Sequence, residues 1–153
     1  MTAAALLHYE DFPVGEVADF GAYEVVADEI KAFAAEFDPQ PFHLDEYAAS
    51  LSLGGALSAS GWHTASMLMR MMYDAYLKDT ASLGSFGVEE VRWLKPVHAG
   101  DILTCRRTTL AARVSASRPE MGIVTFRWLV GDQRGQAKLD MRGVSLIRVR
   151  GAS

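Results

Sequence analysis

The sequence of 153 residues, 50% hydrophobic and 22% charged, predicts one globular domain spanning residues 1–153. Its net charge of −4 argues against nucleic acid as the main partner, because phosphate binding needs a basic surface; no apolar stretch is long enough to cross a bilayer, so no membrane is expected. A single cysteine, Cys105, and an N-terminal apolar run without a preceding basic region favour a reducing, cytoplasmic location.

The first half of the chain predicts one strand followed by helices. Residues 20–27 alternate and carry β-branched side chains, which is typical of a strand. Residues 27–37 place apolar side chains at helical intervals, and Pro39 ends this helix because proline disfavours helical geometry in the preceding residue. A short helix is expected at 43–52. The longest helical pattern, 60–78, is apolar on more than one side, which predicts deep burial.

The second half is rich in strand-forming residues and is broken by Gly, Pro and Asp. It predicts four long strands, at 86–97, 101–115, 122–133 and 136–150. These elements make an α+β domain in which a curved antiparallel sheet wraps around the long helix. Such a sheet has two exposed edges, and pairing them between chains is a simple way to cover them, so we expect a homodimer or a dimer of dimers.

The segment "EFDPQPFH" at 36–43 carries the most chemistry. Pro39 and Pro41 fix two φ angles and stiffen the segment, which allows Asp38 and His43 to converge on one point. A carboxylate and a neutral imidazole that reach the same water can share its proton and aim its oxygen, which suits hydration of an activated double bond or the reverse elimination. The alternative is purely structural: Asp before Pro is a common turn, and His43 could simply open the next helix.

The start of the long helix is the second candidate. Free N–H groups and the helix dipole at Ser60, Gly61 and Trp62 would stabilise an oxygen that gains negative charge. Gly61 has no Cβ, so a ligand carbonyl could approach closely. The structural alternative is that Ser60 caps the helix and that Gly61 serves packing.

The "DPQPFH" segment resembles the signature of the MaoC-like dehydratases, a family that includes (R)-specific enoyl-CoA hydratases. That signature runs Gly-Asp-x-Asn-Pro-aliphatic-His, and Asp38, Pro41 and His43 agree with it in identity and spacing. Ser60 and Gly61 lie where many members carry His-Gly. "VRWLKPVHAGD" at 91–101 and "SRPEMGIVTFRW" at 117–128 also resemble the family, so the resemblance covers nearly the whole chain.

The resemblance implies a hot-dog fold, in which an antiparallel sheet wraps around a long central helix, and usually a dimer. It implies that Asp38 and His43 activate water and that the N–H of Gly61 polarises a thioester carbonyl. No metal or redox cofactor is implied, since coenzyme A arrives as part of the substrate. The neighbouring residues that we expect to bind substrate are Gln40, Phe42, Ser60 and Trp62.

The sequence departs from the family signature at four positions. Phe37 stands in place of Gly, Gln40 in place of Asn, Phe42 in place of an aliphatic residue, and Ser60 in place of the frequent His. Gln40 keeps an amide that donates and accepts hydrogen bonds. The two phenylalanines would reshape an acyl pocket, so the departures affect the preferred acyl group more than the reaction type.

Other polar residues carry weaker signals. His63 is expected to be a hydrogen-bonded core or interface histidine, and the histidines show no metal-ligand spacing, which predicts no metal site. Cys105 is expected to act as a small hydrophobe. Basic residues that could bind the phosphates of coenzyme A, or simply face solvent, are Arg92, Lys95, Arg106, Arg107 and Arg118.

The leading expectation is an acyl-CoA hydro-lyase that reversibly hydrates a trans-2-enoyl-CoA to a 3-hydroxyacyl-CoA with the Asp38 and His43 pair. Two alternatives stay open. A hot-dog thioesterase would hydrolyse the thioester instead, and a non-catalytic subunit would bind acyl-CoA without turnover.

Overall fold

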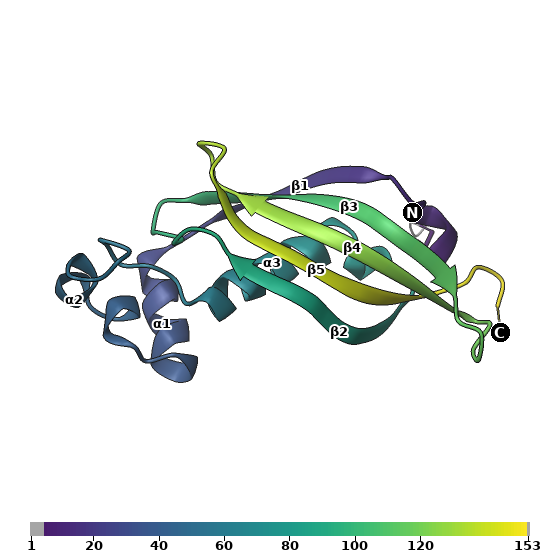
Figure 1. Ribbon diagram of the computed structural model, residues 1–153, viewed down its shortest axis with the longest axis horizontal. Helices are drawn as coiled ribbons and strands as arrows, with labels where there is room; N and C mark the ends of the chain where they lie inside the picture. Colours follow the sequence, from purple (N-terminus) through teal and green to yellow (C-terminus); the bar gives the residue numbers. More distant parts are fainter. Residues whose placement is uncertain (1–4, 153) are drawn as a thin grey trace.

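The computed structural model describes residues 5–152 and places one curved antiparallel sheet over a central helix (Figure 1). The strand order is β1-β3-β4-β5-β2. The strands are β1 (Val17–Glu24), β2 (Ser82–Trp93), β3 (Ile102–Val114), β4 (Met121–Gly131) and β5 (Ala137–Arg148). The α-helices are α1 (Ala27–Phe37), α2 (Glu46–Ser50) and α3 (Gly61–Ala75). Short 3-10 helices lie at Tyr9–Asp11, Pro41–His43 and Leu77–Asp79.

The core lies between α3 and the inner face of the sheet. Alternate residues of β3 are buried, as expected for a strand with one face on the core, and Leu103 and Cys105 point inward. On α3, Met67, Leu68 and Met71 pack against them. The cysteine is therefore a buried hydrophobe, as predicted, and burial raises its thiol pKa to about 12.

The predicted α+β arrangement is confirmed, but β2 is displaced from its predicted range of 86–97. The strand begins earlier because the residues from Ser82 onward pair with β5, with register shifts on either side of Gly84, and both Gly84 and Gly87 have positive φ. It ends at Trp93 because Pro96 lacks the N–H that a continuing ladder would need.

The prediction that the long helix is deeply buried is wrong for one of its sides. The helix is regular only over Gly61–Ala75, and Trp62, Met69 and Tyr73 are at least half exposed, while the opposite side packs into the core. The apolar residues on the second side therefore form an exposed stripe along the helix rather than a second core contact. Within residues 5–152 no helix has the length and apolar character needed to cross a membrane.

A buried charge cluster ties the start of β5 to the segment that follows β2. The Lys138 ammonium donates to the Pro96 carbonyl at 2.8 Å and lies 3.4 Å and 3.6 Å from the carboxylates of Asp101 and Asp132. The next residue, Val97, accepts a hydrogen bond from the Ala59 N–H at 2.8 Å. The lysine thus fixes the strand-like segment that lies beside the start of α3.

Candidate active site

Asp38 and His43 are placed by the ends of two short helical elements. The α1 helix ends at Phe37, and the Asp38 N–H still donates to the Ala34 carbonyl at 2.9 Å, which holds the aspartate at the helix end. Pro41 occupies the first position of the 3-10 helix Pro41–His43, where its missing N–H costs nothing. His43 is the last residue of that turn, so both functional side chains start from fixed backbone.

The two side chains face each other. His43 Nε2 lies 3.4 Å from an Asp38 carboxylate oxygen, and both side chains are largely buried. The other ring nitrogen, Nδ1, lies 2.5 Å from the carbonyl oxygen of Ser58, which makes Nδ1 the donor. Phe42 packs edge-on against the imidazole, with ring centroids 4.5 Å apart. The ring is therefore held in one orientation by a hydrogen bond on one side and an aromatic contact on the other.

This geometry leaves two acceptors aimed at one point. A neutral imidazole that donates from Nδ1 presents a lone pair at Nε2, and the adjacent Asp38 carboxylate also only accepts hydrogen bonds. Two acceptors so close together are best satisfied by a molecule that donates to both, and water has two protons to give. The predicted convergence of Asp38 and His43 is thus present in the structure, and their catalytic role stays a prediction.

The Asp38 carboxylate is stabilised in its charged form. Its pKa is lowered from the ordinary 3.8, first by the neighbouring Ser60 hydroxyl, then by the Gln40 amide and, when its ring is protonated, by the charge of His43; these effects outweigh the desolvation that would raise the pKa. The Gln40 amide donates to the carboxylate at 2.7 Å. The buried Ser60 hydroxyl makes no hydrogen bond of ordinary geometry within the described residues, so it remains free to reorient toward the carboxylate or a ligand.

The start of α3 lies beside this pair, and Trp93 covers it. Ser60 occupies the N-cap position, but its hydroxyl does not cap the helix, which argues against the structural alternative for this residue. The Trp93 indole N–H donates to the Gly61 carbonyl at 2.8 Å, and a Cβ on Gly61 would lie 2.5 Å from the indole ring. Gly61 is thus required by close packing, as the structural alternative had it, because the indole fills the space that the missing Cβ was expected to leave for a ligand carbonyl. The first N–H groups of the helix have no acceptor within the helix.

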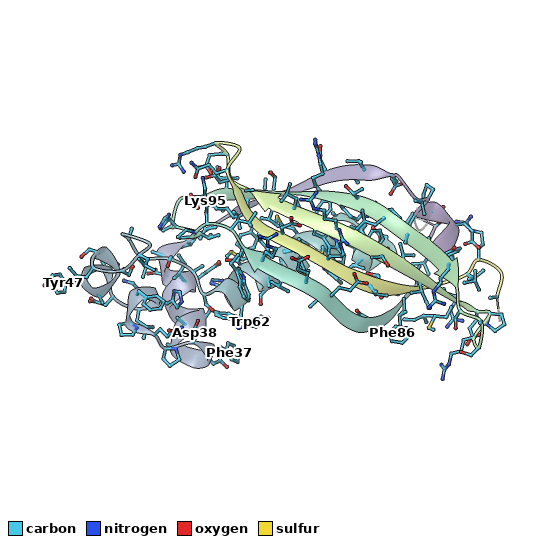
Figure 2. All side chains as sticks on the ribbon, in the orientation of Figure 1. Phe37, Asp38, Tyr47, Trp62, Phe86 and Lys95 are labelled. Carbon is cyan, nitrogen blue, oxygen red and sulfur yellow. The ribbon has the colours of Figure 1, made fainter. Side chains whose placement is uncertain are left out.

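Aromatic side chains are exposed around the site. Trp62 is 61% exposed and meets Trp93 edge to face, with centroids 5.1 Å apart. Phe37 is also exposed, and Figure 2 shows Phe37, Asp38 and Trp62 gathered at the same end of the molecule. Sequence reasoning missed Trp93, which was expected only as a strand residue. The pairing of its indole N–H with Gly61, 32 residues away, left no local signal.

A mostly apolar hollow of about 570 Å³ lies on the far side of Phe42. Leu51, Leu53, Ser58 and Pro96 also line it, whereas Asp38, His43 and Gly61 do not. Phe42 and Ser58 therefore stand between this hollow and the Asp38 and His43 pair. The hollow thus provides apolar space near the site, and the Phe42 ring separates it from Asp38 and His43.

His63 is buried, as predicted, but its hydrogen bonding is not as expected. Its ring stacks on Phe33 at 4.6 Å, and Nδ1 has no partner among the described residues. Burial lowers its pKa, which favours the neutral ring. Among residues 5–152 no cluster of three or more His, Cys, Asp or Glu residues is arranged to hold a metal ion.

The basic candidates for phosphate binding fall into two groups. Arg92, Arg106 and Arg107 have carboxylate neighbours, at distances between 2.5 and 3.7 Å. Arg107 is buried and its guanidinium lies over aromatic rings of the core, so it serves packing. Lys95 and Arg118 have no ion-pair partner within the described residues, and they lie at opposite ends of β2.

A long central helix under a five-stranded antiparallel sheet is the hot-dog fold, and in this chain an acid–imidazole pair lies beside the start of that helix. The sequence model of the family described as "MaoC like domain" matches residues 11–132. The chain therefore belongs to the MaoC-like dehydratase family, as the signature at 38–43 predicted.

Solved structures agree with this assignment. A MaoC-like dehydratase from Rhodospirillum rubrum is 41% identical and superposes with a TM-score of 0.85, covering 95% of this chain and 99% of its own. A protein from Archaeoglobus described as a monoamine oxidase regulatory protein is 26% identical with a TM-score of 0.85, covering 97% and 98%. An (R)-hydratase from A. caviae involved in PHA biosynthesis is 24% identical with a TM-score of 0.69, covering 89% and 97%, and shows the shared fold alone.

Proposed function

We propose that the protein is an acyl-CoA hydro-lyase that reversibly adds water to a trans-2-enoyl-CoA to give a 3-hydroxyacyl-CoA. The observation that carries the proposal is the 3.4 Å approach of His43 Nε2 to Asp38, with Nδ1 donating to the Ser58 carbonyl. That arrangement suits a water molecule held by both of its protons, with its oxygen lone pairs directed away from the dyad. Membership of the MaoC-like family supports the reaction type.

The reaction needs three contributions from the chain. The dyad orients water so that its oxygen bonds to C3 of the enoyl group while one acceptor takes a proton. Electrons of the C2–C3 double bond move toward the thioester carbonyl, whose oxygen gains charge near the free N–H groups of Gly61 and the following residue. As the enolate collapses, the proton is delivered to C2, and the dyad returns to its starting state.

The apolar hollow behind Phe42 is the space we assign to the acyl group. Its position beside the dyad supports this, and Phe42 would turn aside to admit the acyl chain while the Ser58 carbonyl continues to hold the His43 ring. Gln40 and Ser60 would keep Asp38 ionised, and exposed Trp62 would cover the thioester arm. The reaction moves only water and a proton, so we propose no cofactor beyond the coenzyme A of the substrate, and a cytoplasmic site of action where acyl-CoA is present.

We further propose that the protein acts as a homodimer paired through β2. This strand is an edge of the sheet, nearly all of its 12 residues are exposed, and Val88 and Trp93 present apolar side chains there. Unpaired edges of this length invite pairing with another chain. Sedimentation should give twice the chain mass of 16.7 kDa, and Val88→Lys, which places a charge on the edge, should give the monomer. A parent protein that sediments at 16.7 kDa would overturn the dimer.

The test of the reaction is loss of enoyl thioester absorbance with a panel of trans-2-enoyl-CoA substrates of varied length. Asp38→Asn and His43→Ala should each lower turnover at least about a hundredfold, in line with general acid–base contributions. Asp28→Asn, on α1, and His8→Ala are matched controls that should keep the parent rate. Far-ultraviolet circular dichroism checks that each variant stays folded.

Other outcomes identify the alternatives. Release of free thiol from saturated acyl-CoA, without hydration of crotonyl-CoA, would assign a thioesterase and end the hydro-lyase proposal. Tight binding of acyl-CoA with neither reaction would assign a binding subunit. Equal hydration rates in the parent and both dyad variants would remove Asp38 and His43 from the mechanism.

A further inference from the structure

A second hollow lies on the outer face of the sheet, at the opposite end of β2 from the dyad. Its volume is about 840 Å³, within the range of small-molecule sites. Its floor consists of Met121, Ile123 and Leu146, which form a separate buried apolar cluster. Leu83 and Phe86 of β2 form one wall. Along β2, Leu83 and Phe86 lie about 33 Å and about 23 Å from Trp93 at ~3.3 Å per residue, so the hollow is not part of the dyad site of the same chain.

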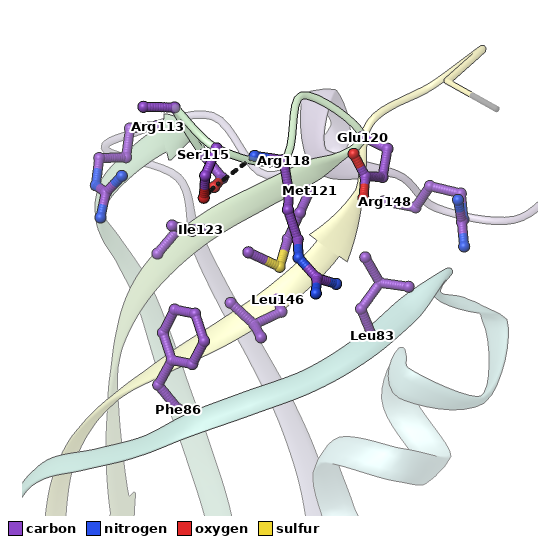
Figure 3. Close-up of a pocket in the computed structure, with 12 residues that line it drawn as sticks. Leu83, Phe86, Arg113, Ser115, Arg118, Glu120, Met121, Ile123, Leu146 and Arg148 are labelled. Carbon is purple, nitrogen blue, oxygen red and sulfur yellow. Dashed lines mark hydrogen bonds between the residues drawn. The ribbon is translucent and has the colours of Figure 1, made fainter.

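Arginines border this apolar floor. Figure 3 shows Arg118 extending across the hollow, with Arg113 and Arg148 on either side. Within the described residues, none of the three has a carboxylate at ion-pair distance, although Glu120 also borders the hollow. Most other arginines of the chain do have one, for example Arg127, whose guanidinium contacts Asp140 at 2.8 Å.

The three arginines carry positive charges that no carboxylate within the described residues neutralises. In a protein of net charge −4, a cluster of cations left unpaired beside an apolar floor favours an anion as its missing partner. Arginine pairs with carboxylates and phosphates through two parallel hydrogen bonds. The apolar floor adds a second requirement, because it is covered only if the ligand also brings hydrocarbon.

We propose that this hollow binds a small amphiphilic anion. Its carboxylate or phosphate pairs with Arg118, flanked by Arg113 and Arg148, and its apolar part lies on Met121 and Leu146. The backbone helps to set the arginine in place, because the Arg118 N–H donates to the Ser115 hydroxyl at 3.2 Å. The site is independent of the dyad chemistry and does not rest on the proposed reaction.

The experiment measures binding to the full chain by calorimetry, with decanoate and decyl phosphate as probes. Inorganic phosphate and decanol supply the charge and the chain separately, and each should bind at least about tenfold more weakly than the amphiphile. Arg118→Gln should weaken binding of the amphiphile about tenfold or more, in line with the loss of a charge-assisted contact. Phe86→Ala should weaken it a few-fold.

Arg142→Gln is the matched control. Arg142 lies on β5, is exposed, and has no ion-pair partner within the described residues, but it does not line the hollow. Its substitution should leave binding unchanged, as should Asp38→Asn, which separates this test from that of the proposed reaction. Methyl signals of Ile123 and Leu146 should shift with the probe.

A competition with coenzyme A distinguishes the source of the anion. Displacement of decyl phosphate by coenzyme A would assign the hollow to the phosphates of a thioester, and no displacement would assign it to a separate carboxylate or phosphate amphiphile. Equal binding of decanol and decanoate would overturn the proposal, as would equal affinity in Arg118→Gln and the parent. A change of sedimenting mass in Arg118→Gln without any probe would show that a second copy of the chain covers the hollow, and would also overturn it.

Discussion

The two ends of β2 both present apolar surface, but they differ in how their charged groups are paired. At the Trp93 end, the Asp38 carboxylate receives the Gln40 amide and His43 is fixed by the Ser58 carbonyl. At the Leu83 end, Arg118 lies over an apolar floor with no carboxylate partner among the described residues. Polar groups that the chain itself orients are prepared for chemistry, because they need not reorganise during reaction. Polar groups left unpaired are available to a ligand.

The dyad end is also the better anchored of the two. Lys138 donates to the Pro96 carbonyl and pairs with two buried carboxylates, and the Trp93 indole N–H donates to the Gly61 carbonyl. The hollow is formed by side chains on the outer face, where one strand edge and one hairpin meet. The comparison predicts that substitutions at the dyad end affect stability and turnover together, whereas substitutions in the hollow affect binding alone.

The largest effect on stability should come from Lys138→Met. The lysine is 3% exposed, and its removal leaves Asp101 and Asp132 without their buried cation, although Arg134 remains nearby. Breaking a buried pair on one side typically costs 3–5 kcal/mol, and the remaining arginine places our expectation at about 3 kcal/mol of unfolding free energy. Urea unfolding measures it. Lys95→Met, on the exposed part of the same segment, should change stability by less than about 0.5 kcal/mol.

Gly61→Ala should come next. The added methyl would lie 2.5 Å from the Trp93 ring, so we expect a loss of about 1–3 kcal/mol from overpacking and a fall in turnover as the helix start moves. Combining it with Trp93→Leu should recover much of the unfolding free energy, because the ring that clashes is gone. Equal stability of Gly61→Ala and the parent would show that the indole yields freely, and the close packing would then be irrelevant.

Ser60→Ala tests the smallest of these effects, the charge state of Asp38. The Ser60 hydroxyl is the largest cause of the lowered Asp38 pKa, so its removal should raise that pKa toward the ordinary 3.8. Carbon NMR of the Asp38 carboxyl measures the titration. Because the folded pKa is lowered, ionised Asp38 stabilises the fold above pH 3.8, and this contribution is lost as pH falls through the folded value. Ser52→Ala, whose hydroxyl donates to the Ala49 carbonyl, is the control and should leave the titration unchanged.

The dyad could be predicted because its two residues lie on one short, proline-stiffened segment. Asp38 and His43 converge through local geometry alone, and the strand and helix order follows from alternation and helical spacing. The support around them could not be predicted. His43 is oriented by the Ser58 carbonyl, a backbone group that every residue carries, and Trp93 reaches Gly61 from a distant strand.

The boundary errors have one long-range cause and one local cause. Strand β2 starts at Ser82 because long-range pairing with β5 recruits residues of low strand propensity. The short helix expected at 43–52 is α-helical only over Glu46–Ser50, because Asp45 caps it by accepting from the Ala48 N–H at 2.8 Å. The outer hollow was missed because its arginines come from separate segments that only the folded sheet brings together.

The claim that Asp38 and His43 act on one water is tested most directly by a double-mutant cycle on enoyl-CoA hydration. Residues that act as a unit are strongly non-additive. We predict that Asp38→Asn and His43→Ala each lower kcat/KM about a hundredfold or more, and that the double variant is no worse than the poorer single variant within about threefold. Losses that multiply in the double variant would show two independent roles and would contradict the shared water.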